Sequence, residues 1–473
     1  METEKKIYNG GYLMKKLMLI CAPVSSRSGY GEHARDLVTS LIEHNKYDIK
    51  IQDVRWGECP RNALKDNNKN HQKILNCIMT DNSLPKQPDI YIDIRIPNEF
   101  QTHGKYNIGI TAGIETTAVS QAWLEGCNKM DLVIVPSEHS KSGFINTLFD
   151  KVQSLPNGQQ QKMAELKLEK PIEVLFEGAD EDVYKSLNHK EIDTEFFDWL
   201  NYEVPEKFAF LSVGQWGKGG YGEDRKDLGR MIKVFYESFA NKKKQPALIL
   251  KTNGATYSII DNEDIKNKIN NVKSQFPKDW KLPNVYLLHG DLSVEEMNFL
   301  YNHPKIKAMV SFTHGEGFGR PLLEFSMIGK PIIATGWSGH VDFLNGNKSL
   351  LLPGELKQVP KSQVWKDIII EQSKWFVGDE SKLYRAFNLV HDDYNSWKRN
   401  SGDLMEINRE KFTLNKMTEK LDEIMEKYLK NTPQQVSLKL PSLKKSKSND
   451  SNKKISPTIK LPKLKKVTKE VTV

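Results

Sequence analysis

Short apolar runs recur along the first 430 residues, and polar or helical patterns separate them. In the first part of the chain these runs predict strands at 17–22, 49–53, 90–94, 107–111, 132–135 and 172–175. Amphipathic patterns between them predict helices at 31–43, 62–78, 117–127 and 138–149. Strands that alternate with helices indicate a parallel sheet that is covered on both faces.

The same alternation starts again at Phe208. Its apolar runs predict strands at 208–214, 247–251, 284–288, 307–312, 331–334 and 349–352, and helices at 363–375, 380–398 and 411–430. A chain of 473 residues is long for a single domain. We therefore expect an extension at 1–13, α/β domains at 14–190 and 207–395 with a linker at 191–206, a C-terminal helix at 396–430 and a tail at 431–473.

The net charge of +8 belongs to this tail. Residues 431–473 hold eleven lysines against Asp450 and Glu470, which leaves −1 for the other 430 residues. The block Lys439–Lys445 returns as Lys460–Lys466, and prolines and like charges make a packed structure unfavourable. We expect a disordered tail; two readings stay open, a solvated extension or a tether to an anionic membrane surface or acidic partner. A near-neutral body argues against specific nucleic-acid binding.

Two further features bear on location. No apolar run approaches the ~20 residues that span a bilayer. The four cysteines form no CxxC pair, which indicates free thiols in a reducing compartment. We expect a cytoplasmic protein that the tail could hold at a membrane surface.

The segment 314–344 carries the most specific chemistry. Gly315, Gly317 and Gly319 alternate through a turn, and Pro321 opens an apolar run that reads as a helix start. Glycines let a backbone approach a ligand closely, and a helix N-terminus favours phosphate. Glu316 and Glu324 frame the turn, and acids suit a ligand with hydroxyls on both sides of its phosphates, such as a nucleotide sugar.

This segment resembles the donor-site signature of retaining glycosyltransferases of family 4, which have the GT-B fold. That fold has two Rossmann-like domains that face each other across a cleft. The resemblance covers about residues 14–430 and includes the glycine-rich loop at 28–34, the Phe210–Gly214 strand with Asp224–Lys226, the turn at 177–180 and the turn at 337–340.

The resemblance implies roles for particular residues. Lys226 would neutralise the diphosphate, Glu316 would bind the donor sugar's hydroxyls, and Glu324 would bind the ribose. The expected catalytic residues are Glu316, Lys226 and Glu115. The expected donor-binding residues are Gly29, Gly31, Arg225, Lys226, Gly315, Glu316, Gly317, Phe318, Gly319, Arg320 and Glu324.

The sequence departs from the family pattern at several positions. Gln215 stands where a second basic residue is expected, and Arg225, Lys218 or Arg320 could take over its role. Glu177 replaces the usual asparagine. Many relatives have a histidine after the 107–111 strand; here Glu115 is the candidate for that region, and His103 reads as a surface residue.

The resemblance implies metal-independent transfer, with retention, from a UDP- or GDP-sugar to a glycan, lipid or protein-linked acceptor, without a cofactor. The alternatives are a GT-B sugar phosphorylase and a non-catalytic sugar-nucleotide-binding scaffold. A dinucleotide site built on Gly29–Ala34 and Asp53 is disfavoured, because six residues separate the strand from Gly29. Asp180 and Asp182 fit a DxD metal motif, but their context is an ordinary turn.

Overall fold

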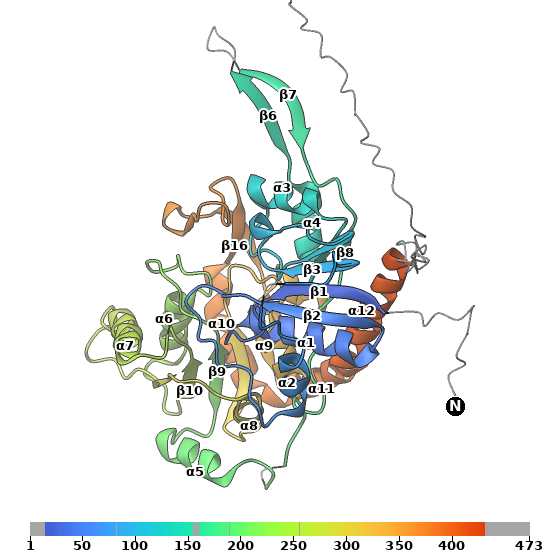
Figure 1. Cartoon of the computed structure of the whole chain (residues 1–473). Helices are drawn as coiled ribbons and strands as arrows, with labels where there is room; N and C mark the ends of the chain where they lie inside the picture. Colours follow the sequence, from blue (N-terminus) through green and yellow to red (C-terminus); the bar gives the residue numbers. More distant parts are fainter. Residues whose placement is uncertain (1–14, 82, 155–159, 189, 255, 431–473) are drawn as a thin grey trace, which may run out of the picture. The chain divides into compact units, whose positions relative to one another are not determined.

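The computed structural model describes residues 15–81, 83–154, 160–188, 190–254 and 256–430. In this part of the chain, two parallel six-stranded sheets with their helices form two α/β domains (Figure 1). The predicted parallel α/β architecture is confirmed. The extension at 1–13 and the basic tail at 431–473 lie outside the described residues.

The first sheet has the strand order β2-β1-β3-β4-β5-β8. Its strands are β1 (Lys16–Ala22), β2 (Tyr47–Asp53), β3 (Ile90–Ile94), β4 (Tyr106–Ile110), β5 (Leu132–Val135) and β8 (Ile172–Val174). The helices of this domain are α1 (Gly29–His44), α2 (Lys69–Leu75), α3 (Gln121–Lys129) and α4 (Glu138–Asn146), with a short 3-10 turn η1 (Pro97–Glu99). A separate hairpin pairs β6 (Phe149–Ser154) with β7 (Gln160–Leu166) and projects from the domain in Figure 1.

The second sheet has the strand order β11-β10-β9-β12-β13-β14. Its strands are β9 (Ala209–Val213), β10 (Ala247–Lys251), β11 (Val285–Leu288), β12 (Ile306–Ser311), β13 (Ile332–Thr335) and β14 (Leu350–Leu352). The helical elements that follow the first domain are α5 (Thr194–Glu203), α6 (Leu228–Phe239), α7 (Ile259–Lys273), α8 (Val294–Asn302), α9 (Arg320–Ser326), η2 (Gly339–Asp342), η3 (Lys361–Gln363), α10 (Glu380–Asp392), α11 (Tyr394–Lys411) and α12 (Leu414–Leu429).

Both faces of the second sheet are buried, because successive strand residues enter different cores. On β9, Phe210 packs with α6 and α10, whereas Leu211 packs with α8 and α9. On β10, Leu248 and Ile249 divide in the same way. This explains why the strands read as continuous apolar runs and not as alternating patterns.

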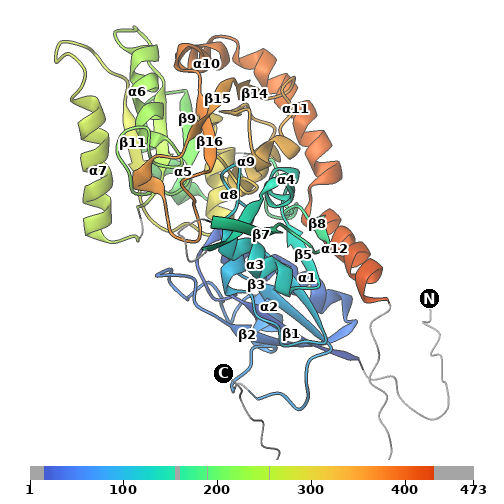
Figure 2. The ribbon, with the colours of Figure 1, turned by 90° about the horizontal axis from the view of Figure 1, so that it is seen from above.

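The last helix returns to the first domain. Thr413 caps the N-terminus of α12 by accepting a hydrogen bond from the Lys416 N–H, and this break separates α11 from α12. Figure 2 shows α11 beside the second domain and α12 continuing along the first. The apolar face of α12 joins the core formed by β1, β2 and α1 through residues Met417, Leu421, Ile424, Met425 and Leu429. The expected single helix at 396–430 is thus two helices.

The predicted helix at 363–375 is wrong. The chain instead forms an antiparallel hairpin of β15 (Gly354–Gln358) and β16 (Lys374–Gly378), joined by a long loop that contains η3. The run Ile368–Ile370 is β-branched, which disfavours a helix. Asp367 adopts a left-handed conformation with φ 62°, which a helix cannot contain.

Other boundaries also differ. The expected linker at 191–206 contains α5, whose Leu200 is buried. The helix predicted at 62–78 is confined to α2, because the Asn68 side chain accepts hydrogen bonds from the Asn70 and His71 N–H groups and starts the helix there. The helix predicted at 117–127 starts later, at the Ser120 cap. The helix predicted at 380–398 ends at Asp392, and α11 follows it.

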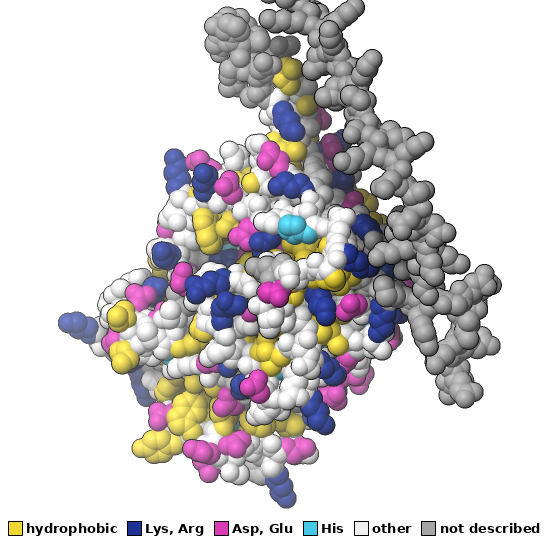
Figure 3. Space-filling view, in the orientation of Figure 1, with side chains coloured by type: hydrophobic (Ala, Val, Ile, Leu, Met, Phe, Trp, Pro, Cys, Tyr) yellow, Lys and Arg dark blue, Asp and Glu magenta, His cyan; other side chains and the backbone are white. Residues whose placement is uncertain are grey.

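The charge of the surface and the state of the cysteines both match the expectations from the sequence. Charged side chains of both signs are interspersed on the face in Figure 3, as expected for a body of near-zero net charge. The cysteines Cys21, Cys59, Cys77 and Cys127 are free. No helix among the described residues is long and apolar enough to cross a membrane.

Candidate functional site

The loops at the carboxyl ends of the two sheets meet between the domains. Loop 111–117 follows β4 of the first domain, and the loops after β9 and β12 of the second domain carry Arg225, Lys226 and Glu316. Ligands of open parallel sheets bind at this end of the strands. The candidate site therefore lies where the two sheets' carboxyl ends face each other.

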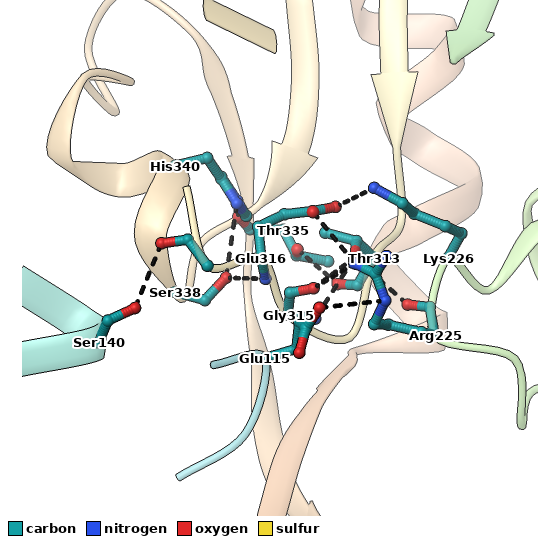
Figure 4. Close-up of polar contacts among 11 residues, drawn as sticks. Glu115, Ser140, Arg225, Lys226, Thr313, Gly315, Glu316, Thr335, Ser338 and His340 are labelled. Carbon is teal, nitrogen blue, oxygen red and sulfur yellow. Dashed lines mark hydrogen bonds and ion pairs between the residues drawn. The ribbon is translucent and has the colours of Figure 1, made fainter. Parts of the chain in front are cut away.

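Four charged residues form a network there, which we name the balanced cluster: Glu115, Arg225, Lys226 and Glu316 (Figure 4). Lys226 Nζ lies 2.5 Å from Glu316 Oε1, and Arg225 Nη1 lies 3.1 Å from Glu316 Oε2. Arg225 Nε lies 3.6 Å from Glu115 Oε1, so this arginine joins the two domains. The cluster brings together the three residues that the sequence predicted to be catalytic.

The two cations dominate the electrostatics of Glu316. Burial by itself raises the pKa of this carboxyl group. The Lys226 ammonium and the Arg225 guanidinium outweigh burial and lower the pKa of Glu316 to about 2. Glu316 is therefore ionised at neutral pH and cannot act as a proton donor there.

The backbone of this loop is fixed by several partners. The Glu316 N–H donates to Ser338 Oγ at 2.9 Å, as Figure 4 shows. The His314 ring stacks on Trp375 of β16 with the centroids 4.3 Å apart, and its Nδ1 lies 2.7 Å from the Phe376 carbonyl oxygen. The β15–β16 hairpin thus holds the loop that presents Glu316.

The three glycines of the loop have different roles. A Cβ atom on Gly315 would overlap the Glu115 carbonyl oxygen, and one on Gly317 would overlap that of Ala112. These two glycines therefore let the loop pack against the backbone of the first domain, a role that the predicted donor binding does not include. Gly319 alone of the three has a left-handed conformation, with φ 97°, and it precedes α9.

A second charged network, which we name the acid-rich cluster, surrounds Arg320. It contains one cation and four carboxylates: Arg320 with Glu32, Asp36, Glu177 and Glu324. Arg320 Nη1 lies 2.6 Å from Asp36 Oδ2 on α1, and Arg320 Nε lies 3.0 Å from Glu324 Oε1. This network also joins the two domains.

Because acids outnumber the cation, burial dominates their titration. Burial raises the pKa of Glu177 to about 7, with Arg320 acting against it. Burial likewise raises the pKa of Glu324 and of Asp36. Arg320 is thus neutralised by protein carboxylates and is a poor substitute for the basic residue missing at Gln215.

A cavity of about 300 Å³ lies between the acid-rich cluster and the outer strands of the second sheet. Gly29, Arg320 and Glu324 line it on one side, and Gly214, Gln215, Lys251, Tyr257 and Asp291 are among its other walls. Lys251 is a cation that the sequence analysis missed. Its Nζ donates to the Gly290 carbonyl at 2.6 Å and lies 5.5 Å from the Tyr257 ring centroid.

The remaining predicted residues fall into two groups. Gly29 lines the cavity, and the Gly31 N–H donates to Ser28 Oγ at the start of α1. Phe318, by contrast, is buried in the apolar core of the second domain and packs on Phe343, so its side chain is structural. Lys218 is exposed.

The possible DxD motif and His103, two alternatives from the sequence, both have ordinary structural explanations. Asp180 accepts a hydrogen bond from the Asp182 N–H and forms a local turn. No group of three or more His, Cys, Asp or Glu residues within the described chain is arranged to hold a metal ion. His103 lies before β4, at the opposite end of the strand from Glu115, and contacts Gln101.

Comparisons with known proteins bear on the fold. No family model matches the chain, and no curated protein matches it. Several solved structures do. Anabaena HepE in complex with UDP and glucose superposes with a TM-score of 0.56 at 12% identity, covering 87% of this chain and 100% of that one.

Two further structures give similar values. Sucrose-phosphate synthase from Thermosynechococcus elongatus has a TM-score of 0.56 at 12% identity, covering 88% of this chain and 100% of that one. A glycosyltransferase from Rickettsia africae has a TM-score of 0.54 at 15% identity, covering 89% and 100%. At such identities the likeness concerns architecture: this chain has the GT-B fold.

Proposed function

We propose that the protein is a glycosyltransferase that uses a nucleotide-diphosphate sugar as donor. The observation that carries this proposal is the balanced cluster, in which Lys226 and Arg225 are held around Glu316 at the carboxyl ends of the sheets. A nearby cavity, with Glu324 and Gly214 in its wall, has room for a ligand, and Gly214 lies against the Lys226 side chain.

The cations suit a departing diphosphate. An ammonium group has three N–H donors, so Lys226 can keep Glu316 as a partner while it donates to phosphate oxygens. Arg225 can donate several parallel hydrogen bonds in the same way. Charges that are already fixed in place stabilise a leaving group without reorganisation.

The carboxylates suit the hydroxylated parts of the donor. In this proposal Glu316 accepts hydrogen bonds from the transferred sugar, and Glu324 accepts them from the ribose. Glu316 has a pKa of about 2 and therefore cannot supply the proton that a two-carboxylate glycosidase mechanism needs. We infer transfer with retention, in which the acceptor attacks from the face that the diphosphate leaves, and we infer that no metal is needed because Lys226 and Arg225 supply the positive charge.

The neighbours in structure guide the choice of donor. HepE is described in complex with UDP, with UDP-glucose, and with UDP and glucose. UDP-glucose is therefore the first donor to test, and GDP- and ADP-sugars complete the set.

The experiment measures thermal stabilisation by UDP, GDP and ADP, and slow release of the nucleoside diphosphate from each nucleotide sugar. A ligand at 100 times its Kd stabilises the folded protein by about 2.7 kcal/mol. We expect stabilisation by at least one nucleotide, hydrolysis of the matching donor, and the same rate with EDTA. If no nucleotide stabilises the protein, the proposal is wrong; turnover that requires inorganic phosphate would identify a phosphorylase instead.

A further inference from the structure

The loop after β2 is fixed to residues 22–27, which lead from the end of β1 to α1. We name residues 54–63 the β2 loop. Four hydrogen bonds tie it, together with Asp53 at the end of β2, to residues 22–27: Val54 N–H to the Ala22 carbonyl (3.2 Å), Arg27 N–H to the Pro60 carbonyl (2.8 Å), Ala63 N–H to the Ser25 carbonyl (3.1 Å) and Ser25 N–H to Asp53 Oδ1 (3.2 Å). Arg61 also pairs with Asp53 at 2.5 Å. The β2 loop therefore has a defined place at the carboxyl end of the first sheet.

This loop places Trp56 on Tyr30. The two rings are stacked, with their centroids 3.9 Å apart and their planes at 28°. Tyr30 is itself anchored, because its hydroxyl lies 2.7 Å from Thr111 Oγ1 and accepts a hydrogen bond from the Ala112 N–H at 2.9 Å. A fixed tyrosine thus supports one face of the Trp56 ring.

The stacked pair lies next to the proposed reaction centre. Tyr30 directly follows Gly29, which lines the donor cavity. Its hydroxyl contacts the start of the loop that carries Glu115, and Ala112 of that loop packs against Gly317. The pair therefore occupies the first domain's side of the cleft, beside the balanced cluster.

Trp56 differs from the tryptophans that build cores. Trp123, Trp216 and Trp375 are 2–5% exposed and belong to apolar clusters. Trp56 is half-buried, belongs to none of the apolar clusters of the described residues, and has exposed neighbours at Arg55, Gly57 and Glu58. Core packing does not explain an indole held in this way.

We propose that Trp56, supported by Tyr30, is the subsite for a pyranose acceptor. A pyranose has an apolar C–H face that packs on an aromatic ring, while its hydroxyls remain free for polar partners such as Arg55 and Glu58. This inference rests on the proposed function. It narrows the glycan, lipid or protein-linked acceptor to one whose accepting group is a sugar ring.

The subsite fits the chemistry of the transfer step. The acceptor hydroxyl oxygen forms a bond to the anomeric carbon of the donor as the bond between that carbon and the phosphate oxygen breaks. The electron pair of the broken bond leaves with the diphosphate, and the proton of the acceptor hydroxyl passes to the leaving phosphate oxygen. Trp56 takes no part in bond making; it sets where the acceptor ring lies.

The test uses four probes, the methyl pyranosides of glucose, galactose, mannose and N-acetylglucosamine. Saturation-transfer NMR on UDP-saturated protein reports which probe protons touch the protein. A separate assay without added UDP reports transfer as an acceleration of UDP release from UDP-glucose. We compare the wild type with Trp56→Ala and Trp56→Phe. Trp280→Ala is the matched control, because Trp280 is 39% exposed and its ring contacts Phe276 in the second domain.

We expect at least one probe to bind through the C–H protons of one ring face. Trp56→Ala should raise the KM for that probe about tenfold, the value of one lost aromatic contact, and Trp56→Phe should restore part of it. Stabilisation by UDP should stay unchanged in all variants, and Trp280→Ala should match the wild type.

Two results would overturn the subsite. One is that none of the probes binds to UDP-loaded wild-type protein; the other is that Trp56→Ala binds them as the wild type does. Both differ from failure of the proposed function, in which none of UDP, GDP and ADP would stabilise the protein.

Discussion

The balanced and acid-rich clusters both join the two domains. In each, an arginine of the second domain contacts at least one carboxyl group of the first. In the balanced cluster two cations face two acids, and the pKa of Glu316 is lowered to about 2. In the acid-rich cluster one cation faces four acids, and the pKa of Glu177 is raised to about 7. The two carboxyls titrate in opposite directions because Glu316 has two cations within 3.1 Å, whereas Glu177 lies 3.9 Å from one cation that three other acids share.

This difference in charge between the clusters indicates which part of the donor each one binds, the anionic diphosphate or the hydroxylated ribose. An incoming diphosphate gains from Lys226 and Arg225, because in the balanced cluster the cations are as many as the acids. Beside Arg320 the same diphosphate would have a single cation, and it would have to displace the acids that already pair with that cation. Carboxylates in that place suit neutral hydroxyls, which supports the assignment of Glu324 to the ribose.

The largest expected effect is on stability, in the acid-rich cluster. Arg320→Met leaves four carboxylates without their cation, and breaking a buried ion pair in this way costs about 3–5 kcal/mol. We expect a clear fall in the free energy of unfolding measured by urea titration. Arg385→Met, an exposed arginine on α10, should have little effect. Arg320→Lys, which keeps the charge, should lose less than Arg320→Met; equal stability of Arg320→Met and the wild type would contradict the role of Arg320.

The next effect is on catalysis, in the balanced cluster. Glu316→Gln and Lys226→Ala should each reduce transfer about 100-fold or more, which corresponds to ~3 kcal/mol of transition-state stabilisation. Steady-state kinetics with the best donor measures this loss, and circular dichroism checks that both variants fold. Rates close to those of the wild type in either variant would remove the site assignment.

A smaller effect concerns pH, through Glu177. A carboxyl whose folded pKa is raised to about 7 binds a proton in the folded state that the unfolded state has already lost. Stability should therefore fall as pH rises from about 4.5 to about 7, since the unfolded carboxyl titrates near the lower value. Glu177→Gln mimics the protonated group and should remove this loss.

The measurement is the melting temperature of Glu177→Gln and the wild type at pH 5 and pH 8. We expect similar values at pH 5 and a variant about 2–4 °C more stable at pH 8. A variant that is less stable at pH 8 would mean that the contact of Glu177 with Arg320 outweighs the cost of burying its charge.

The strands were the most predictable part of the fold. A run such as Ala247–Lys251 is buried on both faces and carries its own signal. The β15–β16 hairpin was missed because its pairing depends on a partner strand some twenty residues away, and local pattern at 363–375 does not contain it. The α5 helix is not predicted because the polar and aromatic composition of 191–206 indicates a linker, and of this helix Leu200 alone is buried.

The site residues that act through the chemistry of their own side chains could be predicted from the sequence. The residues whose role depends on packing between distant segments could not. Glu316 and Lys226 were found from motif and charge. The contacts of Gly315 and Gly317 with the first domain could not be predicted from the sequence, because they depend on how the two domains pack together. The sequence makes Arg320 a candidate ligand of the diphosphate. Its four acidic partners could not be predicted, because they come from three separate segments of the chain. Lys251 had a usable signal, since a lysine that ends an apolar strand lies at the binding edge of a parallel sheet.

The smallest expected effect concerns the tail, which lies outside the described residues. Deleting 431–473 should leave soluble turnover unchanged, because every residue of both clusters lies before it. We propose that the tail tethers the protein to an anionic membrane surface, where each lysine contributes about 1 kcal/mol at low salt. Vesicle co-sedimentation should show weaker binding after deletion. Equal binding of both forms at low salt would leave the tail as a solvated extension.

The central claim is that the balanced cluster, and not the acid-rich cluster, binds the donor's diphosphate. A crystal structure with the most stabilising nucleoside diphosphate tests it most directly. We predict phosphate oxygens about 3 Å from Lys226 Nζ and from the Arg225 guanidinium, with the ribose beside Glu324. Phosphates bound at Arg320 with its carboxylates displaced, or bound away from Lys226 altogether, would contradict the account.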